Sequence, residues 1–258
     1  MILQVNPMNV AELLSHLDNL LASGTFQDYG PNGLQVGNAQ VALKKIGVAV
    51  TADIETIKQA IKANVNVLIV HHGIFWKGMP YPITGMMYKR IQLLIQHDIQ
   101  LLAYHLPLDA HPTLGNNWRV ALDLNWKDLQ PFGSSFPNLG VQGSFSPVHI
   151  NTFTNLLSQY YQAPLKGSAL GGPSTVSSAA IVSGGAYREL SFAVTRQVDC
   201  FITGNFDEPA WSTALENNIN FLAFGHTATE KIGPKSLAHH LNSVLQVPTI
   251  FIDTDNPF

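Results

Sequence analysis

The chain has 258 residues, of which 46% are apolar and only 12% are charged. This composition excludes a disordered chain and a charge-laced coiled coil, because soluble domains ordinarily carry about 25% charged residues. With 14 Lys and Arg against 17 Asp and Glu, the net charge is −3, so binding of nucleic acid through a basic stripe is not expected. No apolar run approaches the roughly 20 residues of a membrane span.

The N-terminal region lacks the basic segment that opens a secretory signal peptide, because the first Lys or Arg is Lys44. The single cysteine, Cys200, excludes an intrachain disulfide and fits a reducing compartment. These features predict a cytoplasmic protein. At roughly 100–200 residues per domain, the length allows one large domain or two smaller ones.

In the first half of the chain, apolar strands alternate with helices. Isoleucines and an alanine recur at helical spacing from Ile54, and Thr51 or Asp53 is expected to cap that helix. Alternation of this kind is typical of βαβ units with a mainly parallel sheet. The predicted elements are strands over 46–50, 65–70 and 100–104 and a helix over 87–97.

The second half repeats this pattern, with strands near 179–183 and 219–224 and a helix over 208–216. The segment IQHDIQLLAYHLPLD parallels LENNINFLAFGHTATE, and each carries a histidine followed four residues later by a carboxylate. This predicts an internal duplication: two similar α/β lobes, each a three-layer α/β/α arrangement with mainly parallel strands. The first lobe is predicted over residues 1–126 and the second over 127–258, with a metal site between them. Convergent helix–strand spacing is the alternative explanation. The Gly-, Pro- and Ser-rich stretch 130–146 is interpreted as a linker or hairpin.

Ligand-type side chains end three of the predicted strands. In parallel α/β sheets, ligands bind beyond the carboxyl ends of the strands, so these side chains are expected to share one site. Imidazole with carboxylate is the ligand set of Zn, Fe, Mn and similar divalent ions, and no thiolates accompany it. The candidate ligands are His71, His72, Asp109, His226 and Glu230.

Five ligands exceed what one tetrahedral ion with an open position needs, so two divalent ions are predicted. Paired ions lower the pKa of a water molecule and clamp a phosphoryl centre, which indicates hydrolytic chemistry on a phosphorylated small molecule. His105 is interpreted either as a further ligand or as a group that orients one, and it is the candidate proton shuttle. The remaining histidines are interpreted as structural, with His16 at the surface of the first helix.

Four motifs resemble the GTP cyclohydrolase 1 type 2 homologs, also called the NIF-three-like family, in its short bacterial form. They are DYGPNGLQVG, IVHHGIFWKG, YHLPLDAHPTLGNN and FGHTATE, and they occur in order over almost the whole chain. The resemblance implies two α/β lobes around a dinuclear metal centre and a toroidal homohexamer. It also implies the same five metal ligands. Two positions depart from the family pattern: Asn205 stands where many relatives have Glu, and Ser212 where a histidine is common.

Two classes of function are kept open. The first is a metal-dependent hydrolase acting on a nucleotide or related phosphorylated compound, with GTP ring opening suggested by the family name. The second is a non-catalytic protein that stores or delivers metal, or a ring-shaped adaptor. Metal exchange discriminates them, because a carrier releases its ions to an acceptor and a catalytic site retains them.

Overall fold

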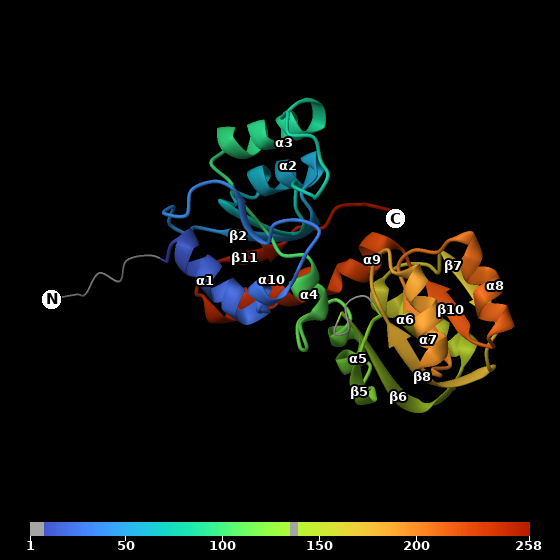
Figure 1. Cartoon of the computed structure of the whole chain (residues 1–258). Coiled ribbons are helices and arrows are strands. Elements are labelled where there is room, and N and C mark those ends of the chain that lie inside the picture. Colours follow the sequence, from blue (N-terminus) through green and yellow to red (C-terminus); the bar gives the residue numbers. More distant parts are fainter. Residues whose placement is uncertain (1–7, 135–138) are drawn as a thin grey trace. The chain divides into compact units, whose positions relative to one another are not determined.

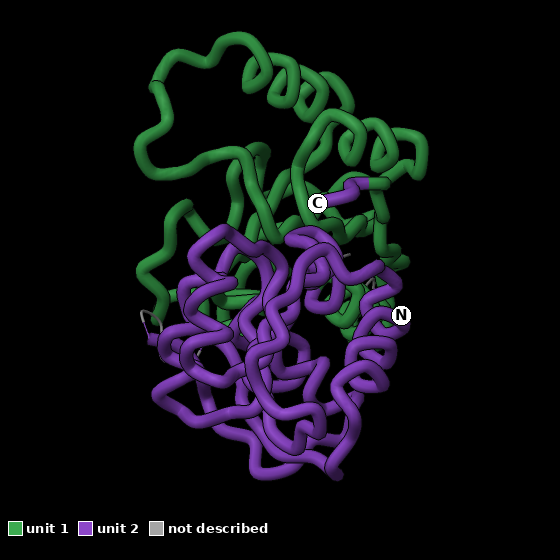
Figure 2. Tube along the Cα trace, turned by 90° about the vertical axis from the view of Figure 1, so that its right-hand side faces the viewer, with its two compact units in different colours: residues 1–108, 234–255 green, residues 109–233, 256–258 purple. Residues whose placement is uncertain are grey.

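A computed structural model describes residues 8–134 and 139–258, and it divides into two compact units. Unit 1 comprises residues 1–108 and 234–255, and unit 2 comprises residues 109–233 and 256–258 (Figure 2). Each unit is built around its own sheet.

The sheet of unit 1 has the strand order β1-β4-β3-β2-β11, in which β1 alone runs antiparallel to its neighbour. Thus four of its strands are parallel, as the alternating strands and helices predicted. The strands are β1 Gly33–Val36, β2 Ile46–Thr51, β3 Val67–His72, β4 Gln100–Ala103 and β11 Thr249–Phe251.

Helices cover both faces of this sheet. In Figure 1, α2 and α3 lie on one face and α1 and α10 on the other. The residues of β2, β3 and β4 are almost all buried, because both faces of the strands are covered. Asp53 caps α2 by accepting from the Thr56 N–H at 2.7 Å, one of the two caps predicted. The helices are α1 Val10–Leu21, α2 Ile54–Lys62, α3 Gly85–Gln96 and α10 Ile232–Val244, with a 3₁₀ turn at Ser23–Thr25.

The sheet of unit 2 has the strand order β5-β6-β8-β9-β10-β7, with β8, β9 and β10 parallel and the other pairs antiparallel. The Gly/Pro/Ser-rich stretch is therefore largely strand, in the antiparallel pair β5 and β6; residues 135–138 lie outside the described part. The strands are β5 Lys127–Phe132, β6 Gly140–His149, β7 Gly167–Leu170, β8 Thr175–Ile181, β9 Cys200–Thr203 and β10 Asn220–Ala223.

Alternate side chains of the central strands of unit 2 enter two different apolar clusters, one on each face. Cys200 and Ile202 pack with α6, while their neighbour Phe201 packs with α7 and α8. Cys200 is thus a core residue, as predicted. The helices are α5 Trp118–Asp123, α6 Ile150–Tyr161, α7 Leu190–Thr195, α8 Glu208–Glu216 and α9 His226–Glu230, with a 3₁₀ turn at Tyr187–Glu189.

The order of elements repeats between the units. In unit 1, α1 precedes the edge strand β1, which pairs antiparallel with β4. In unit 2, α6 precedes the edge strand β7, which pairs antiparallel with β10. The repeated segments also share a left-handed residue at the turn before β4 and before β10, Asp98 with φ 50° and Asn218 with φ 54°. The prediction of two similar α/β lobes in three layers is therefore confirmed.

The compact units divide the chain at different places from the boundary predicted after residue 126. One of the differences lies at the C-terminal end, where β11 pairs in parallel with β2 and so belongs to unit 1. The short helix α4 Leu106–Ala110 contains the first of the places at which the chain passes from one unit to the other. Among the described residues, no helix is long and apolar enough to cross a membrane.

His16 is not the simple surface residue that was expected. Its ring stacks on His240 of α10, with ring centroids 6.1 Å apart and planes inclined by 15°. The pairing could not be foreseen because the two residues lie at opposite ends of the chain.

Candidate metal centre

Three imidazole rings meet at the carboxyl end of the parallel strands of unit 1. His71 and His72 end β3, and their ring centroids are 4.6 Å apart. The ring of His105, which follows β4, lies 5.0 Å from His71 and 5.6 Å from His72. Each ring offers one nitrogen such that the three lie within 4.8 Å of one another. We call these three residues the histidine cluster.

Hydrogen bonds at Nδ1 orient all three rings. The Nδ1 of His71 lies 3.3 Å from the carbonyl oxygen of Tyr104, which can only accept, so Nδ1 carries the proton and Nε2 carries the lone pair. The Nδ1 of His72 lies 3.1 Å from the hydroxyl of Thr51. Such bonds are the usual means by which proteins present the second ring nitrogen to a metal ion.

The third ring, His105, is held by a carboxylate that sequence reasoning did not single out. The Oδ1 of Asp28 accepts from His105 Nδ1 at 2.7 Å. Asp28 also accepts from the N–H groups of Tyr29 and Leu106 and from the side chain of Asn32. Asp28 opens the DYGPNGLQVG motif, but its role could not be predicted from the sequence because its partner His105 lies 77 residues away.

Opposing influences act on the pKa of Asp28. Burial would raise the pKa of this carboxyl group. The hydrogen bond and charge of His105, with the N–H groups of Leu106 and Tyr29, outweigh burial and lower the pKa below its usual value. Asp28 is therefore an anion at neutral pH, and it favours the tautomer of His105 that carries its proton on Nδ1.

Unit 2 gathers a second set of ligand-type side chains around the turn that follows β8. Ser183 donates its hydroxyl hydrogen to Asp109 Oδ1 at 3.2 Å, and Asn116 donates to the same oxygen at 2.8 Å. Beside Ser183, a Cβ atom added to Gly184 would stand 2.1 Å from Glu230 Oε1 and 3.2 Å from His226 Nε2. Gly184 adopts a φ of +66°, which favours glycine.

His226 and Glu230 lie one helical turn apart on α9. This spacing places their side chains on one helix face, with His226 Nε2 and Glu230 Oε1 separated by 3.2 Å. We call Asp109, His226 and Glu230 the unit 2 half-site. Its two carboxylates and one imidazole complement the three imidazoles of the histidine cluster in ligand type.

The two residues that depart from the family pattern have different surroundings. Asn205 Nδ2 lies 3.9 Å from the position that a Cβ would take on Gly185, and His226 Cε1 lies 3.5 Å from the same point. Asn205 is therefore a neighbour of the half-site. Ser212 is exposed on α8, where its hydroxyl donates to the carbonyl oxygen of Pro209.

The structure thus brings together His71, His72 and His105 in unit 1, and Asp109, His226 and Glu230 in unit 2. The nitrogen and oxygen donors of the histidine cluster and the half-site suit a first-row divalent ion, and the one cysteine of the chain is buried in the core. The residues present therefore fit a metal ion.

Comparisons with known proteins agree with this architecture. The family model described as Duf34/NIF3 (NGG1p interacting factor 3) matches residues 8–257. A protein of Chlamydia pneumoniae named GTP cyclohydrolase 1 type 2 homolog is 80% identical over 251 residues, which cover 97% of this chain and 100% of that protein.

Two solved structures each match over 97% of this chain and over 100% of their own chain. Protein ybgI is 34% identical, with a TM-score of 0.89. Protein TTHA1606 from Thermus thermophilus is 33% identical, also with a TM-score of 0.89.

Proposed function

The chain belongs to the Duf34/NIF3 family, and on that premise we propose that it is a hydrolase that uses two divalent metal ions. Its substrate in this proposal is a nucleotide or a related phosphorylated compound. The observation that carries the proposal is the histidine cluster, in which three ligand nitrogens lie within 4.8 Å of one another. Apolar residues would pack better than three imidazoles at a strand end, so packing does not explain why histidines are there.

The number of ligands supports two ions rather than one. In the proposal, His71 and His72 hold different ions, and the half-site of Asp109, His226 and Glu230 completes both coordination shells. Continuity of the chain supports this assembly, because Asp109 lies on α4, the helix that begins directly after His105.

Bound divalent ions would supply Lewis acidity, which polarises a phosphoryl or ring centre and makes a water molecule more acidic. The chain itself holds and orients these groups. Asp28 keeps the proton of His105 on Nδ1, so that Nε2 can accept a proton from the attacking water and return it to the leaving group. The hydrogen bonds from Asn116 and Ser183 fix the direction of the Asp109 carboxylate.

The first substrate to examine is GTP, because curated relatives carry the name GTP cyclohydrolase 1 type 2 homolog. Protein loaded with Zn²⁺ or Mn²⁺ is incubated with GTP and with other nucleoside triphosphates. Release of formate, orthophosphate or pyrophosphate identifies which bond is cleaved. The proposal predicts turnover that chelation abolishes.

Matched variants tie such turnover to the site. His71→Ala and His226→Ala should each abolish turnover while the far-ultraviolet circular dichroism stays that of the wild type. His97→Ala, which removes an exposed histidine at the end of α3, should have no effect. Turnover that persists in His71→Ala would disprove the proposal, and metal binding with no turnover on any nucleotide would favour the metal-delivery alternative.

We further propose that the protein forms a homohexamer in the cytoplasm. The low proportion of charged residues supports this, as do the exposed apolar side chains of α3 and the segment before it, which include Tyr81, Ile83, Met86 and Tyr88. Sedimentation equilibrium should give a mass six times that of the chain, and a monomer at micromolar concentration would contradict the proposal.

A further inference from the structure

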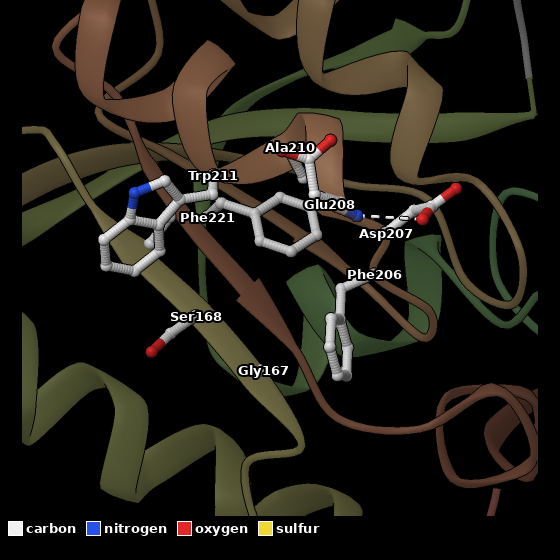
Figure 3. Close-up of a pocket in the computed structure, with 9 residues that line it drawn as sticks. Gly167, Ser168, Phe206, Asp207, Glu208, Ala210, Trp211 and Phe221 are labelled. Atoms are coloured by element: carbon white, nitrogen blue, oxygen red, sulfur yellow. Dashed lines mark hydrogen bonds between the residues drawn. The ribbon is translucent and has the colours of Figure 1, made fainter.

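A hollow of about 550 Å³ in unit 2 lies outside both groups of metal ligands. Its wall is formed by β7, β10, the first turns of α8 and the loop before α8 (Figure 3). The volume falls within the roughly 300–1,000 Å³ of small-molecule sites. The lining residues are Gly167, Ser168, Ala169, Phe206, Asp207, Glu208, Ala210, Trp211 and Phe221.

Three aromatic rings dominate this hollow. Phe221 is buried and forms its floor, whereas Trp211 and Phe206 are 60% and 55% exposed. Phe206 packs over Gly167, where an added Cβ would stand 2.5 Å from the ring. Two large aromatic side chains left half in water beside a third ring are typical of a surface that another flat group covers.

The two carboxylates of the hollow do not face its aromatic rings. Asp207 accepts from the hydroxyl of Tyr187 and from the Glu208 N–H, so its carboxylate is engaged, and in Figure 3 it points away from the rings. The carboxylate of Glu208 is likewise directed away from Phe206. The side-chain donors of the hollow are the hydroxyl of Ser168 and the indole Nε1–H of Trp211. Ring faces with these two donors suit a neutral, flat heteroaromatic ring.

The hollow adjoins the unit 2 half-site at the same edge of the sheet. Gly167 pairs with Ala223, the last residue of β10, so it lies at the carboxyl end of the parallel strands. Phe206 follows Gly204 by two residues, and a Cβ on Gly204 would stand 2.7 Å from the Cα of His226. Two residues span at most about 7 Å, so one nucleoside-sized molecule can reach from the rings toward His226.

We propose that this hollow binds the heteroaromatic base of the substrate, stacked on Trp211 and Phe206. The inference rests on the proposed function and adds the residues that recognise one part of its substrate. Stacking between a base and an aromatic side chain is sequence-tolerant, so the hollow selects flat rings as a class.

Isothermal titration of the full-length protein with guanosine and with adenosine tests this inference, because neither nucleoside carries a phosphate. Trp211→Ala should weaken binding of the nucleosides by roughly tenfold or more, which corresponds to the loss of one stacked ring. Trp211→Phe should restore most of the affinity, since it keeps an aromatic face.

The matched control is Leu215→Ala, which removes an exposed apolar side chain one turn further along α8 and outside the hollow. It should leave nucleoside affinity unchanged. Absence of nucleoside binding in the wild type would overturn the inference, as would equal affinity in Trp211→Ala. If Trp211→Ala and Leu215→Ala both change the sedimentation coefficient and neither loses nucleoside affinity, copies of the chain meet at the face of α8 instead.

Failure of the base site and failure of the proposed hydrolase function give different results. If chelation and His226→Ala abolish nucleotide turnover while Trp211→Ala leaves KM unchanged, the hydrolase proposal stands and the base site is wrong. If nucleosides bind in a Trp211-dependent manner and no nucleotide is turned over, the base site stands and the hydrolase proposal is wrong.

Discussion

Replacing Asp28 by Asn isolates the carboxylate that holds the histidine cluster. Asp28 is 7% exposed and accepts four hydrogen bonds, two at each oxygen. Oδ1 accepts from Tyr29 N and His105 Nδ1, and Oδ2 accepts from Asn32 Nδ2 and Leu106 N. An amide has a single acceptor oxygen, so its NH₂ group must face one of these pairs of donors.

Each buried donor that loses its acceptor costs about 1–3 kcal/mol. Two lost acceptors would therefore cost about 2–6 kcal/mol. If the Asn32 amide turns toward water, one lost acceptor remains and the cost is about 1–3 kcal/mol. The loss should also loosen His105, whose ring lies beside the rings of the proposed ligands His71 and His72. Loss of a group that supports metal ligands typically lowers metal affinity about 10- to 100-fold.

Urea unfolding followed by circular dichroism, together with competitive zinc titration, measures both effects of Asp28→Asn. The matched control is Asp53→Asn at the N-cap of α2, where Asn and Asp cap about equally well and the expected change is under about 0.5 kcal/mol. If Asp28→Asn unfolds at the urea concentration of the wild type and binds zinc equally tightly, the assigned role of Asp28 is refuted.

Two further predictions concern pH and the Gly184 turn. Burial, and then the charge of His16, lower the pKa of His240 below its usual 6.5, so protonation favours the unfolded chain. The resulting loss of stability is absent above about pH 6.5 and develops as the pH falls through the lowered pKa. The urea midpoint should therefore fall less between pH 7 and pH 5 in His240→Gln than in the wild type, and equal falls would contradict this. Gly184→Ala should cost about 1–2 kcal/mol for its positive φ and should also displace Glu230 and weaken zinc binding. Gly78→Ala, at φ +83° with open space around it, should show the first effect without the second, and tight zinc binding in Gly184→Ala would be inconsistent with the site.

Local patterns predicted much of the fold. The helix Glu208–Glu216 has the predicted bounds, and His71 and His72 end a buried strand as expected. Asp53 caps its helix because that contact spans only three residues and depends on local chemistry. Where periodicity and capping decide the structure, a single sequence contains the necessary information.

Contacts between distant segments could not be predicted in this way. The strand Thr249–Phe251 is short, and its parallel pairing with β2 joins segments about two hundred residues apart. The bond between Asp28 and His105 spans 77 residues, so Asp28 carried no signal beyond its loop. The stretch 130–146 was predicted to be a linker or hairpin, and it lies largely in the antiparallel pair β5 and β6. The lengths of these strands could not be predicted, because glycine, proline and serine interrupt their apolar alternation.

Metal stoichiometry tests the central claim most directly. Protein loaded with zinc, freed of excess ion and measured by elemental analysis should contain about two ions per chain in the wild type. His71→Ala in unit 1 and His226→Ala in unit 2 should each lower this content, because both units contribute ligands in the proposal. Two ions retained in either variant, or no zinc in the wild type, would contradict a dinuclear centre built from these residues.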